Sequence, residues 1–306
     1  MRGDRMKKLT IGTRGSELAL WQARFIREKL AALTNIPTDL KIIKTTGDRI
    51  DDVSFSKMEG KGFFTKEIEE ELLSGGIDLA VHSLKDLQTE LTDGLQVGAV
   101  CFRVDPRERV LIRPKSYDES QPLGVIPNGT IGTSSVRRQC QIADLMPNLT
   151  IKDLRGNVPT RVNKLRDGLY DAIIIADAGL GRIEHDISDL RSILLDVETF
   201  VPAPAQGMLG IEIRSDDLDT REIVSKLDEP DLRVQVRLER GLLEKFEGGC
   251  QLPLGALSSV RKDAYHLRAV FGIGEDGAWK RLRRTEVKGN DPESMVNEAY
   301  LKLTTE

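Results

Sequence analysis

The sequence is poor in aromatic residues and cysteine, and it contains no long apolar run. Aromatic residues make up 5% of the 306 residues, which leaves few surfaces on which the bases of single-stranded nucleic acid could stack. The three cysteines, Cys101, Cys140 and Cys250, are an odd number, which argues against a disulfide framework and favours a reducing cytoplasm. No stretch approaches the roughly 20 apolar residues of a membrane span.

The charge balance also limits the possible partners. The chain has 45 Lys and Arg against 49 Asp and Glu, so it has no overall positive field to attract nucleic acid. The basic N-terminus passes straight into a strand-like run and lacks the apolar core of a signal peptide. We therefore expect a cytoplasmic protein that binds neither nucleic acid nor a membrane, with a length sufficient for two or three domains.

Alternating strand and helix patterns predict an α/β fold. We expect strands over residues 8–13, 40–46, 79–81, 95–100, 130–133, 150–154 and 172–176, and helices over 16–33, 65–73 and 230–246. The residues between 103 and 109 are interpreted as a crossover between domains. A C-terminal unit is expected to contain paired strands over 265–273 and 279–287 and a last helix starting at Asp291 and Pro292.

Six arginines recur just after predicted strands, near a turn or a helix start: Arg14, Arg137, Arg138, Arg155, Arg161 and Arg182. Arginine is the preferred side chain for bidentate binding of carboxylate or phosphate. The repetition at one topological position predicts a cleft lined with guanidinium groups, in a protein that is negatively charged overall. We therefore expect a small polyanionic ligand.

A polar cluster, His82, Ser83, Lys85 and Asp86, follows the predicted strand 79–81. Ligands of open α/β sheets bind beyond the carboxyl ends of strands, so this position favours a functional site. The alternative is a surface ion pair between Lys85 and Asp86.

Two further segments allow more than one interpretation. The polar stretch 47–62 is long enough to be a lid or a disordered loop, and its Lys57 and Lys61 are either anion contacts or ordinary solvated charges. Cys250 lies between two glycines and a proline on a predicted tight loop, with no partner at metal-binding spacing. It is either a small buried apolar residue or a reactive or covalently modified thiol.

Eight motifs in order relate the chain to a known family: TRGSELALWQ, GKGFFTKE, AVHSLKD, GTSSVRRQCQ, LRGNVPTR, AGLGR, PAQGMLGIE and EGGCQLPLG. The match runs from about residue 8 to about residue 255, and together the motifs resemble the porphobilinogen deaminase (hydroxymethylbilane synthase) family. The resemblance implies two doubly wound α/β lobes, like those of a periplasmic binding protein, and a small α+β C-terminal domain. The implied domains are 1–103 with 202–224, then 104–201, then 225–306.

The resemblance also implies an activity. Members of the family are transferases that deaminate four porphobilinogens and join them head to tail into hydroxymethylbilane, a step of tetrapyrrole and haem biosynthesis. Chain growth starts from a dipyrromethane cofactor that is attached through a thioether to the cysteine matching Cys250. No metal is implied, and the family suggests a monomer.

The resemblance also implies site residues, namely those at the positions of this sequence that match the family's motifs. Asp86 matches the catalytic carboxylate. The cofactor contacts implied are Cys250, Lys85, Ser83, Thr133, Ser134, Ser135, Arg137, Arg138 and Gly156. The substrate contacts implied are Arg14, Ser16, Arg155, Arg161, Arg182 and Gln206. The lid residues implied are Lys57, Lys61 and Phe64.

The sequence departs from the family pattern at a few positions. Gln88 replaces a proline two residues after Asp86, the stretch before Gln206 reads APAQG, and Asp177 places a carboxylate where it could compete for Arg182. Two other functions fit the same residues: a two-lobed solute-binding protein without chemistry, and an inactive relative that keeps the cofactor. The mass of the intact protein separates the solute-binding protein from the other two, and turnover of porphobilinogen separates an active enzyme from an inactive relative.

Overall fold

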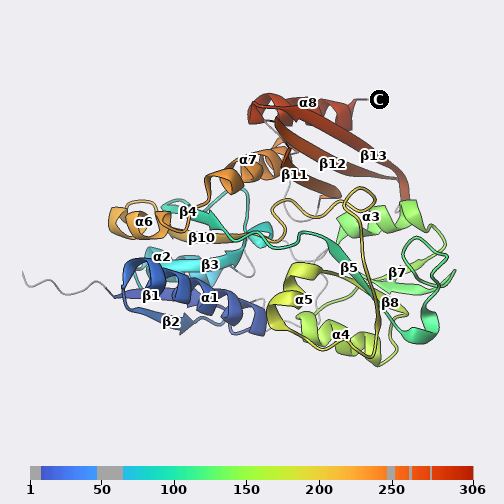
Figure 1. The fold of residues 1–306 in the computed structure, drawn as a ribbon, viewed down its shortest axis with the longest axis horizontal. Coiled ribbons are helices and arrows are strands. Elements are labelled where there is room, and N and C mark those ends of the chain that lie inside the picture. The colour runs from blue at the N-terminus through green and yellow to red at the C-terminus, as the bar shows by residue number, and fades with distance from the viewer. Residues whose placement is uncertain (1–7, 47–64, 247–251, 262–263, 276–277, 306) are drawn as a thin grey trace, which may run out of the picture. The chain divides into compact units, whose positions relative to one another are not determined.

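The computed structural model describes residues 8–46, 65–246, 252–261, 264–275 and 278–305. The chain forms two compact units (Figure 1). Unit 1 contains Met1–Arg103 and Met208–Arg233, and unit 2 contains Val104–Gly207 and Val234–Glu306. The chain therefore passes between the units three times. The division into three domains expected from the resemblance stays a prediction.

Unit 1 is built on one five-stranded sheet. Its elements are β1 (Leu9–Thr13), α1 (Glu17–Thr34), β2 (Thr38–Ile42), α2 (Lys66–Leu73), β3 (Leu79–Ser83), β4 (Leu95–Cys101), β10 (Leu209–Arg214) and α6 (Leu218–Ser225). The strand order is β2-β1-β3-β10-β4, in which β1 is parallel to β2 and β3, and β10 is antiparallel to both of its neighbours.

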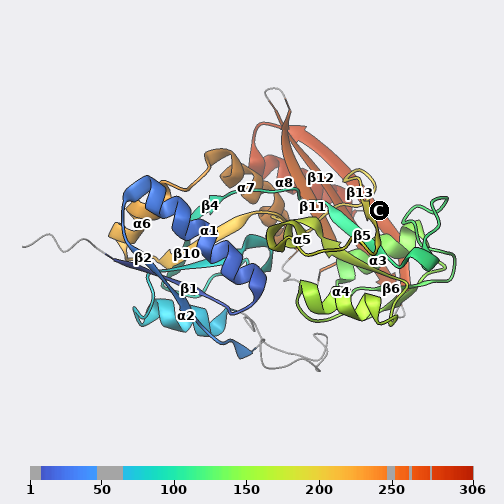
Figure 2. The same cartoon turned by 60° about the horizontal axis from the view of Figure 1, so that its bottom comes forward.

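Both faces of this sheet are covered, because alternate side chains of its strands enter two separate cores. Leu79 and Val81 of β3 pack in one core with Ile26 of α1, whereas Ala80 packs in the other with Leu72 of α2. Figure 2 shows α1 and α2 on opposite sides of the sheet. A sheet covered on both faces explains why its strands are continuous apolar runs.

Unit 2 contains a second sheet with the same plan. The elements are β5 (Glu108–Ile112), β6 (Thr130–Gly132), α3 (Val136–Leu145), β7 (Thr150–Lys152), α4 (Val158–Arg166), β8 (Ala172–Ala176), α5 (Asp177–Ile183) and β9 (Arg191–Leu194). The order is β7-β6-β8-β5-β9, with β6 parallel to β7 and β8, and β5 antiparallel to β8 and β9. Cores containing α3 and α4 residues cover its two faces.

The C-terminal part of unit 2 is a small α+β arrangement with one layer of strands and one layer of helix. Its elements are α7 (Pro230–Lys245), which starts in unit 1, followed by β11 (Leu254–Arg261), β12 (Ala264–Glu275), β13 (Ala278–Gly289) and α8 (Pro292–Thr304). The three strands form an antiparallel sheet in sequence order, and α8 packs on β12 and β13 (Figure 1). Two doubly wound sheets and an α+β C-terminal part confirm the predicted fold class.

The described part of the chain contains no helix that is both long and apolar enough to span a membrane. The same part contains no group of three or more His, Cys, Asp or Glu side chains arranged to hold a metal ion.

Candidate functional site

A small cavity of about 100 Å³ in unit 1 brings together four of the predicted site residues: Arg14, Ser16, Ser83 and Asp86. Residues from the start of α1, from β3 and from the turn after it line this cavity, and they include Gln22 and His82. A guanidinium group, hydroxyl groups and a carboxylate therefore face one space, which can bind an anionic group and a positively charged or N–H group together.

The start of α1 is well defined by its cap. Ser16 is the N-cap, and its side chain accepts a 3.4 Å hydrogen bond from the Ala19 amide. Thr13, which is buried, donates its hydroxyl to the Ala19 carbonyl and so ties β1 to the first turn. A helix start that lines a cavity contributes the positive end of the helix dipole, which favours an anion there.

Asp86 lies on a short 3₁₀ turn, Leu84–Asp86, directly after β3. Leu84 and Leu87 are 1% and 2% exposed, so the turn is anchored by two apolar side chains while Asp86 is exposed and Lys85 is half-buried. The Leu84 amide also donates to the Met208 carbonyl. This alternation places the carboxylate on a fixed turn rather than on a flexible loop. The prediction ended the strand at Val81, whereas His82 and Ser83 belong to it.

Unit 2 holds a second set of predicted residues at the start of α3. Ser135 is the N-cap, and Thr133, which is 2% exposed, accepts a hydrogen bond from the Ser135 amide at 3.2 Å. The Ser134 hydroxyl donates to the Leu154 carbonyl and accepts from the Leu154 amide, at 3.1 and 3.0 Å. Ser134 thus joins the loops after β6 and β7, while Ser135 is half-buried.

The start of α4 is fixed by a side-chain cap and a glycine turn. Asn157 is the N-cap and accepts from the Thr160 amide at 2.9 Å. Gly156 has φ 107°, and a Cβ at this position would lie 2.6 Å from Thr160 Cγ2, so only glycine fits. The Gly156 carbonyl accepts a 2.7 Å hydrogen bond from Arg161 Nε. Arg155 and Arg161 are both half-buried beside this turn.

Arg137 and Arg138 have an internal partner that the sequence did not reveal. Both are buried, and their Nη2 atoms bind the two oxygens of Glu108 at 2.5 and 2.8 Å. Glu108 is 0% exposed and starts β5, within a segment that was predicted only as a crossover. Burial lowers the pKa of Arg137, although the nearby Glu108 carboxylate acts in the opposite direction.

Gln206 and Arg182 also hold backbone groups of unit 2. The Gln206 amide, 0% exposed, donates to the Pro106 carbonyl at 2.7 Å, and Arg182 Nη2 donates to the Gly207 carbonyl at 2.7 Å. Asp177, which the sequence suggested as a competitor for Arg182, instead accepts a 2.5 Å hydrogen bond from Arg109.

Four predicted residues lie outside the described part of the chain: Lys57, Lys61, Phe64 and Cys250. The other two cysteines, Cys101 and Cys140, are buried. Burial raises the pKa of the Cys140 thiol to about 12, which makes it a poor nucleophile.

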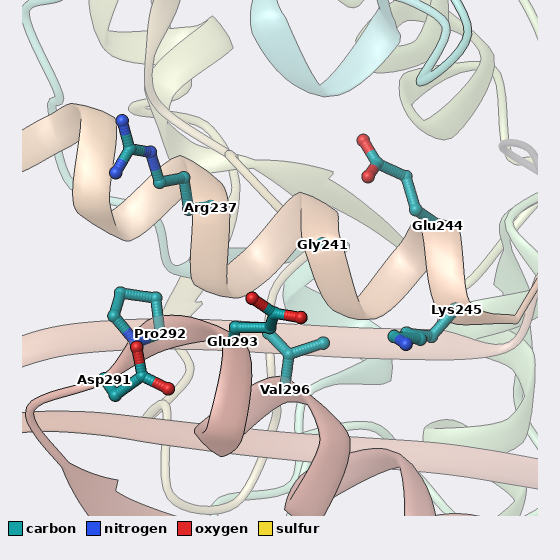
Figure 3. Close-up of a pocket in the computed structure, with 8 residues that line it drawn as sticks. All are labelled: Arg237, Gly241, Glu244, Lys245, Asp291, Pro292, Glu293 and Val296. Carbon is teal, nitrogen blue, oxygen red and sulfur yellow. The ribbon is translucent and has the colours of Figure 1, made fainter.

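A larger hollow of about 510 Å³ lies between α7 and the start of α8 (Figure 3). Arg237, Glu244 and Lys245 come from α7, and Asp291 and Glu293 come from the start of α8. The two signs of charge are mixed there, and the predicted site residues are not among its lining residues. The smaller cavity beside Asp86 is therefore the better candidate site.

Comparison with known proteins gives two family matches. Residues 9–222 match the model described as "Porphobilinogen deaminase, dipyromethane cofactor binding domain", and residues 234–305 match "Porphobilinogen deaminase, C-terminal domain".

Curated relatives cover most of the chain. A porphobilinogen deaminase of Maridesulfovibrio salexigens is 46% identical over 92% of this chain and 89% of that protein. The proteins of the same name from Syntrophomonas wolfei and Geobacillus kaustophilus are 43% and 41% identical, over 87% and 98% of this chain and 85% and 94% of those proteins.

Solved structures with similarity to the chain include a substrate-binding protein of an amino acid ABC transporter (14% identity, 79% of this chain, 100% of that one, TM-score 0.41). An L-arginine-bound protein of the same kind from Streptococcus pneumoniae is 13% identical over 78% of this chain and 90% of that one, with a TM-score of 0.38.

Both family models and the curated relatives agree over nearly the whole sequence. The chain belongs to the porphobilinogen deaminase family.

Proposed function

We propose that the cavity beside Asp86 is the place where this chain deaminates porphobilinogen and joins four molecules of it head to tail into hydroxymethylbilane. The observation that carries this proposal is the presence of the Asp86 carboxylate, the Arg14 guanidinium and the Ser83 hydroxyl around one cavity. Family membership supports the reaction, a transfer that releases ammonia and supplies tetrapyrrole and haem biosynthesis.

The donor groups fit the dipyrromethane cofactor of the family. Each pyrrole of such a group carries an acetate, a propionate and a ring N–H, so it needs cations and hydroxyls for its carboxylates and an acceptor for its N–H. Arg14 and Ser16 at the start of α1 supply the cation and the hydroxyl for a carboxylate, and Asp86 supplies the acceptor for the ring N–H. In unit 2, Ser135 and Arg155 lie at helix starts that suit a carboxylate in the same way.

Cys250 is proposed to hold the cofactor through a thioether. When bound, the cofactor supplies the free pyrrole α-carbon from which the chain grows. Cys250 then acts as an anchor and does not turn over in each cycle. The proposed cofactor contacts are Ser83, Lys85, Thr133, Ser134, Ser135, Arg137, Arg138 and Gly156.

Asp86 is the proposed catalytic residue. The amino group of the porphobilinogen aminomethyl side chain, in its protonated form, leaves as ammonia, and the methylene carbon that remains becomes a cation conjugated with the pyrrole ring. A carboxylate near the ring N–H stabilises this charge. The α-carbon that attacks forms the new C–C bond and releases its proton, which Asp86 accepts and passes to ammonia. The exposed position of Asp86 on an anchored turn suits a group that exchanges protons with substrate.

Arginines bind the growing number of substrate carboxylates in this proposal. The proposed substrate contacts are Arg14, Ser16, Arg155, Arg161, Arg182 and Gln206. Arg137 and Arg138 already bind Glu108, so each would reach a ligand carboxylate only with a further N–H or by giving up this bond. Lys57, Lys61 and Phe64 are proposed as lid residues.

We further propose a cytoplasmic monomer whose partner is porphobilinogen and neither nucleic acid nor a membrane. Elution from a size-exclusion column with light-scattering detection tests the oligomeric state, and a mass of twice 34.1 kDa would contradict it.

Turnover of porphobilinogen by the wild-type protein and by Asp86 variants tests the function. We expect Asp86→Asn to lose nearly all turnover while Asp86→Glu keeps some, because a carboxylate survives at a shifted position. Substantial turnover by Asp86→Asn would remove Asp86 from the catalytic role, and no turnover by the cofactor-loaded wild type would overturn the function.

A further inference from the structure

A buried glutamate of α7 holds the turn that leads into Gln206. Glu239 is 0% exposed, and its Oε2 accepts a 2.7 Å hydrogen bond from the Ala205 amide. Its Oε1 accepts from the Ser258 amide at 2.7 Å and from the Ser258 hydroxyl at 2.8 Å, and Ser258 lies on β11. One side chain thus fastens this turn to the C-terminal sheet of unit 2, and the mechanism above gives it no task.

The turn that Glu239 holds is strained at Ala205. The Gln206 amide donates to the Ala203 carbonyl at 3.0 Å, which closes a four-residue turn with Pro204 and Ala205 at its centre. Ala205 is 0% exposed and has a φ of 61°, in the left-handed region. A proline followed by a residue of positive φ is typical of a type II turn, in which that second residue is usually glycine. An alanine there costs free energy because its Cβ crowds the backbone, so the contacts around it have to hold it in place.

Two of the proposed substrate contacts depend on the same turn. Gln206 follows Ala205 directly, and its side-chain amide donates to the Pro106 carbonyl. Gly207 comes next, and its carbonyl accepts a 2.7 Å hydrogen bond from Arg182 Nη2. A change of φ at Ala205 would redirect both of these residues and move the carbonyl that Arg182 binds. The conformation of Ala205 therefore sets where the Gln206 amide and the Arg182 guanidinium lie.

We propose that Glu239 is a positioning residue for substrate binding: by holding Ala205 in the left-handed conformation, it fixes Gln206 and Arg182 where they bind substrate. This inference rests on the proposed function, in which these two side chains contact the substrate. Glu239 is fully buried and acts through the turn. It should affect substrate binding more than the chemical step, since Asp86 is anchored by separate contacts.

The test compares the variant Glu239→Gln with the double variant Glu239→Gln/Ala205→Gly. A glutamine has one acceptor oxygen, and Ser258 offers two donors for it, so the Ala205 amide loses its acceptor. We expect Glu239→Gln to raise the KM for porphobilinogen about fivefold and to keep kcat within about twofold of the wild type, because only binding is weakened. Glycine adopts a positive φ without strain, so adding Ala205→Gly should return KM to within about twofold of the wild type.

Asp171 provides a matched control within unit 2. Its carboxylate accepts from the Thr130 amide, the Ser116 hydroxyl and Arg113 Nη2 at 2.8, 2.7 and 2.7 Å, and none of these three is a predicted site residue. Asp171→Asn should lower the urea midpoint and leave KM unchanged. The control separates a loss of stability from the expected change in KM.

Two results would overturn the inference. One is an unchanged KM in Glu239→Gln. The other is a raised KM that Ala205→Gly does not lower, since Glu239 would then act by another route than Ala205. If Glu239→Gln does not fold, Glu239→Asp takes its place in the same comparison, because its shorter side chain cannot reach Ala205 and Ser258 together, and the same two results decide.

The wild type shows which of the two proposals has failed. A cofactor-loaded wild-type protein without turnover would overturn the proposed function and this inference with it. Turnover by the wild type together with either of the contradicting KM results would overturn the inference alone.

Discussion

The side-chain amide of Gln22 donates a 2.8 Å hydrogen bond to the hydroxyl of Ser83 and so joins α1 to the end of β3 inside the cavity. Gln22 is 3% exposed, so water cannot easily replace it. We expect Gln22→Leu to lower kcat/KM about tenfold, because the Ser83 hydroxyl loses the donor that orients it.

A double-mutant cycle with Ser83→Ala tests how Gln22 acts. If Gln22 works through Ser83, the double variant should be little worse than Ser83→Ala alone. Additive losses in kcat/KM would show that Gln22 has a separate role.

Glu108 is expected to be essential for stability, because it balances both Arg137 and Arg138 in a buried site. Glu108→Gln should lower the free energy of unfolding by about 3–5 kcal/mol, since it leaves two buried cations without an anion. Urea unfolding measures this change. Asp189→Asn, which removes the exposed partner of Arg166, is the control and should cost at most about 1 kcal/mol. Equal losses in the two variants would contradict the assignment.

Two glycines, Gly156 of the LRGNVPTR motif and Gly181 of the AGLGR motif, should respond in opposite ways to alanine. Gly156→Ala places a Cβ against Thr160 at a φ of 107°, so we expect a loss of about 1–3 kcal/mol and a KM several-fold higher, because Arg155 and Arg161 flank this turn. Gly181→Ala meets no atom within 4 Å on the helix α5 and should stabilise the protein by up to about 1 kcal/mol. Unfolding curves that move in the same direction for both variants would contradict this account.

Cys140 should make stability depend on pH in the alkaline range. Its pKa is about 12 in the folded protein against 9.0 for the free side chain, so the unfolded thiol ionises first. The buried, protonated thiol makes its full contribution to the free energy of unfolding below pH 9. This contribution is lost as pH rises from 9 to 12, by up to about 1.4 kcal/mol per pH unit. Relative to Cys140→Ala, the wild type should therefore lose stability between pH 9 and 10.5. Parallel urea midpoints for the two proteins over this range would show that Cys140 does not titrate as described.

Local features of the site were predictable, whereas its long-range partners were not. The start of the helix at Ser16 and the position of Asp86 just after a strand follow from short sequence patterns. The strand expected at 40–46 is instead Thr38–Ile42, because its register is set by pairing with β1.

The missed features depend on residues far apart in the sequence. Glu108 pairs with arginines 29 and 30 residues away, and Glu212 pairs with His82 across 130 residues. Hydrophobic periodicity identifies the apolar face of a helix or strand, but it does not identify which buried charged residues pair with one another. The strand β5 was missed for the same reason, since its first residue is a charged Glu108 that only the tertiary structure buries.

The mass of the intact, freshly purified protein tests the central claim most directly. If Cys250 anchors a dipyrromethane, the wild type should be heavier than its sequence mass by two porphobilinogens less two ammonias. Peptide mapping should place the addition on Cys250, and Cys250→Ser should lack both the addition and turnover. An active wild-type protein at its unmodified mass, or the same addition on Cys250→Ser, would contradict the account.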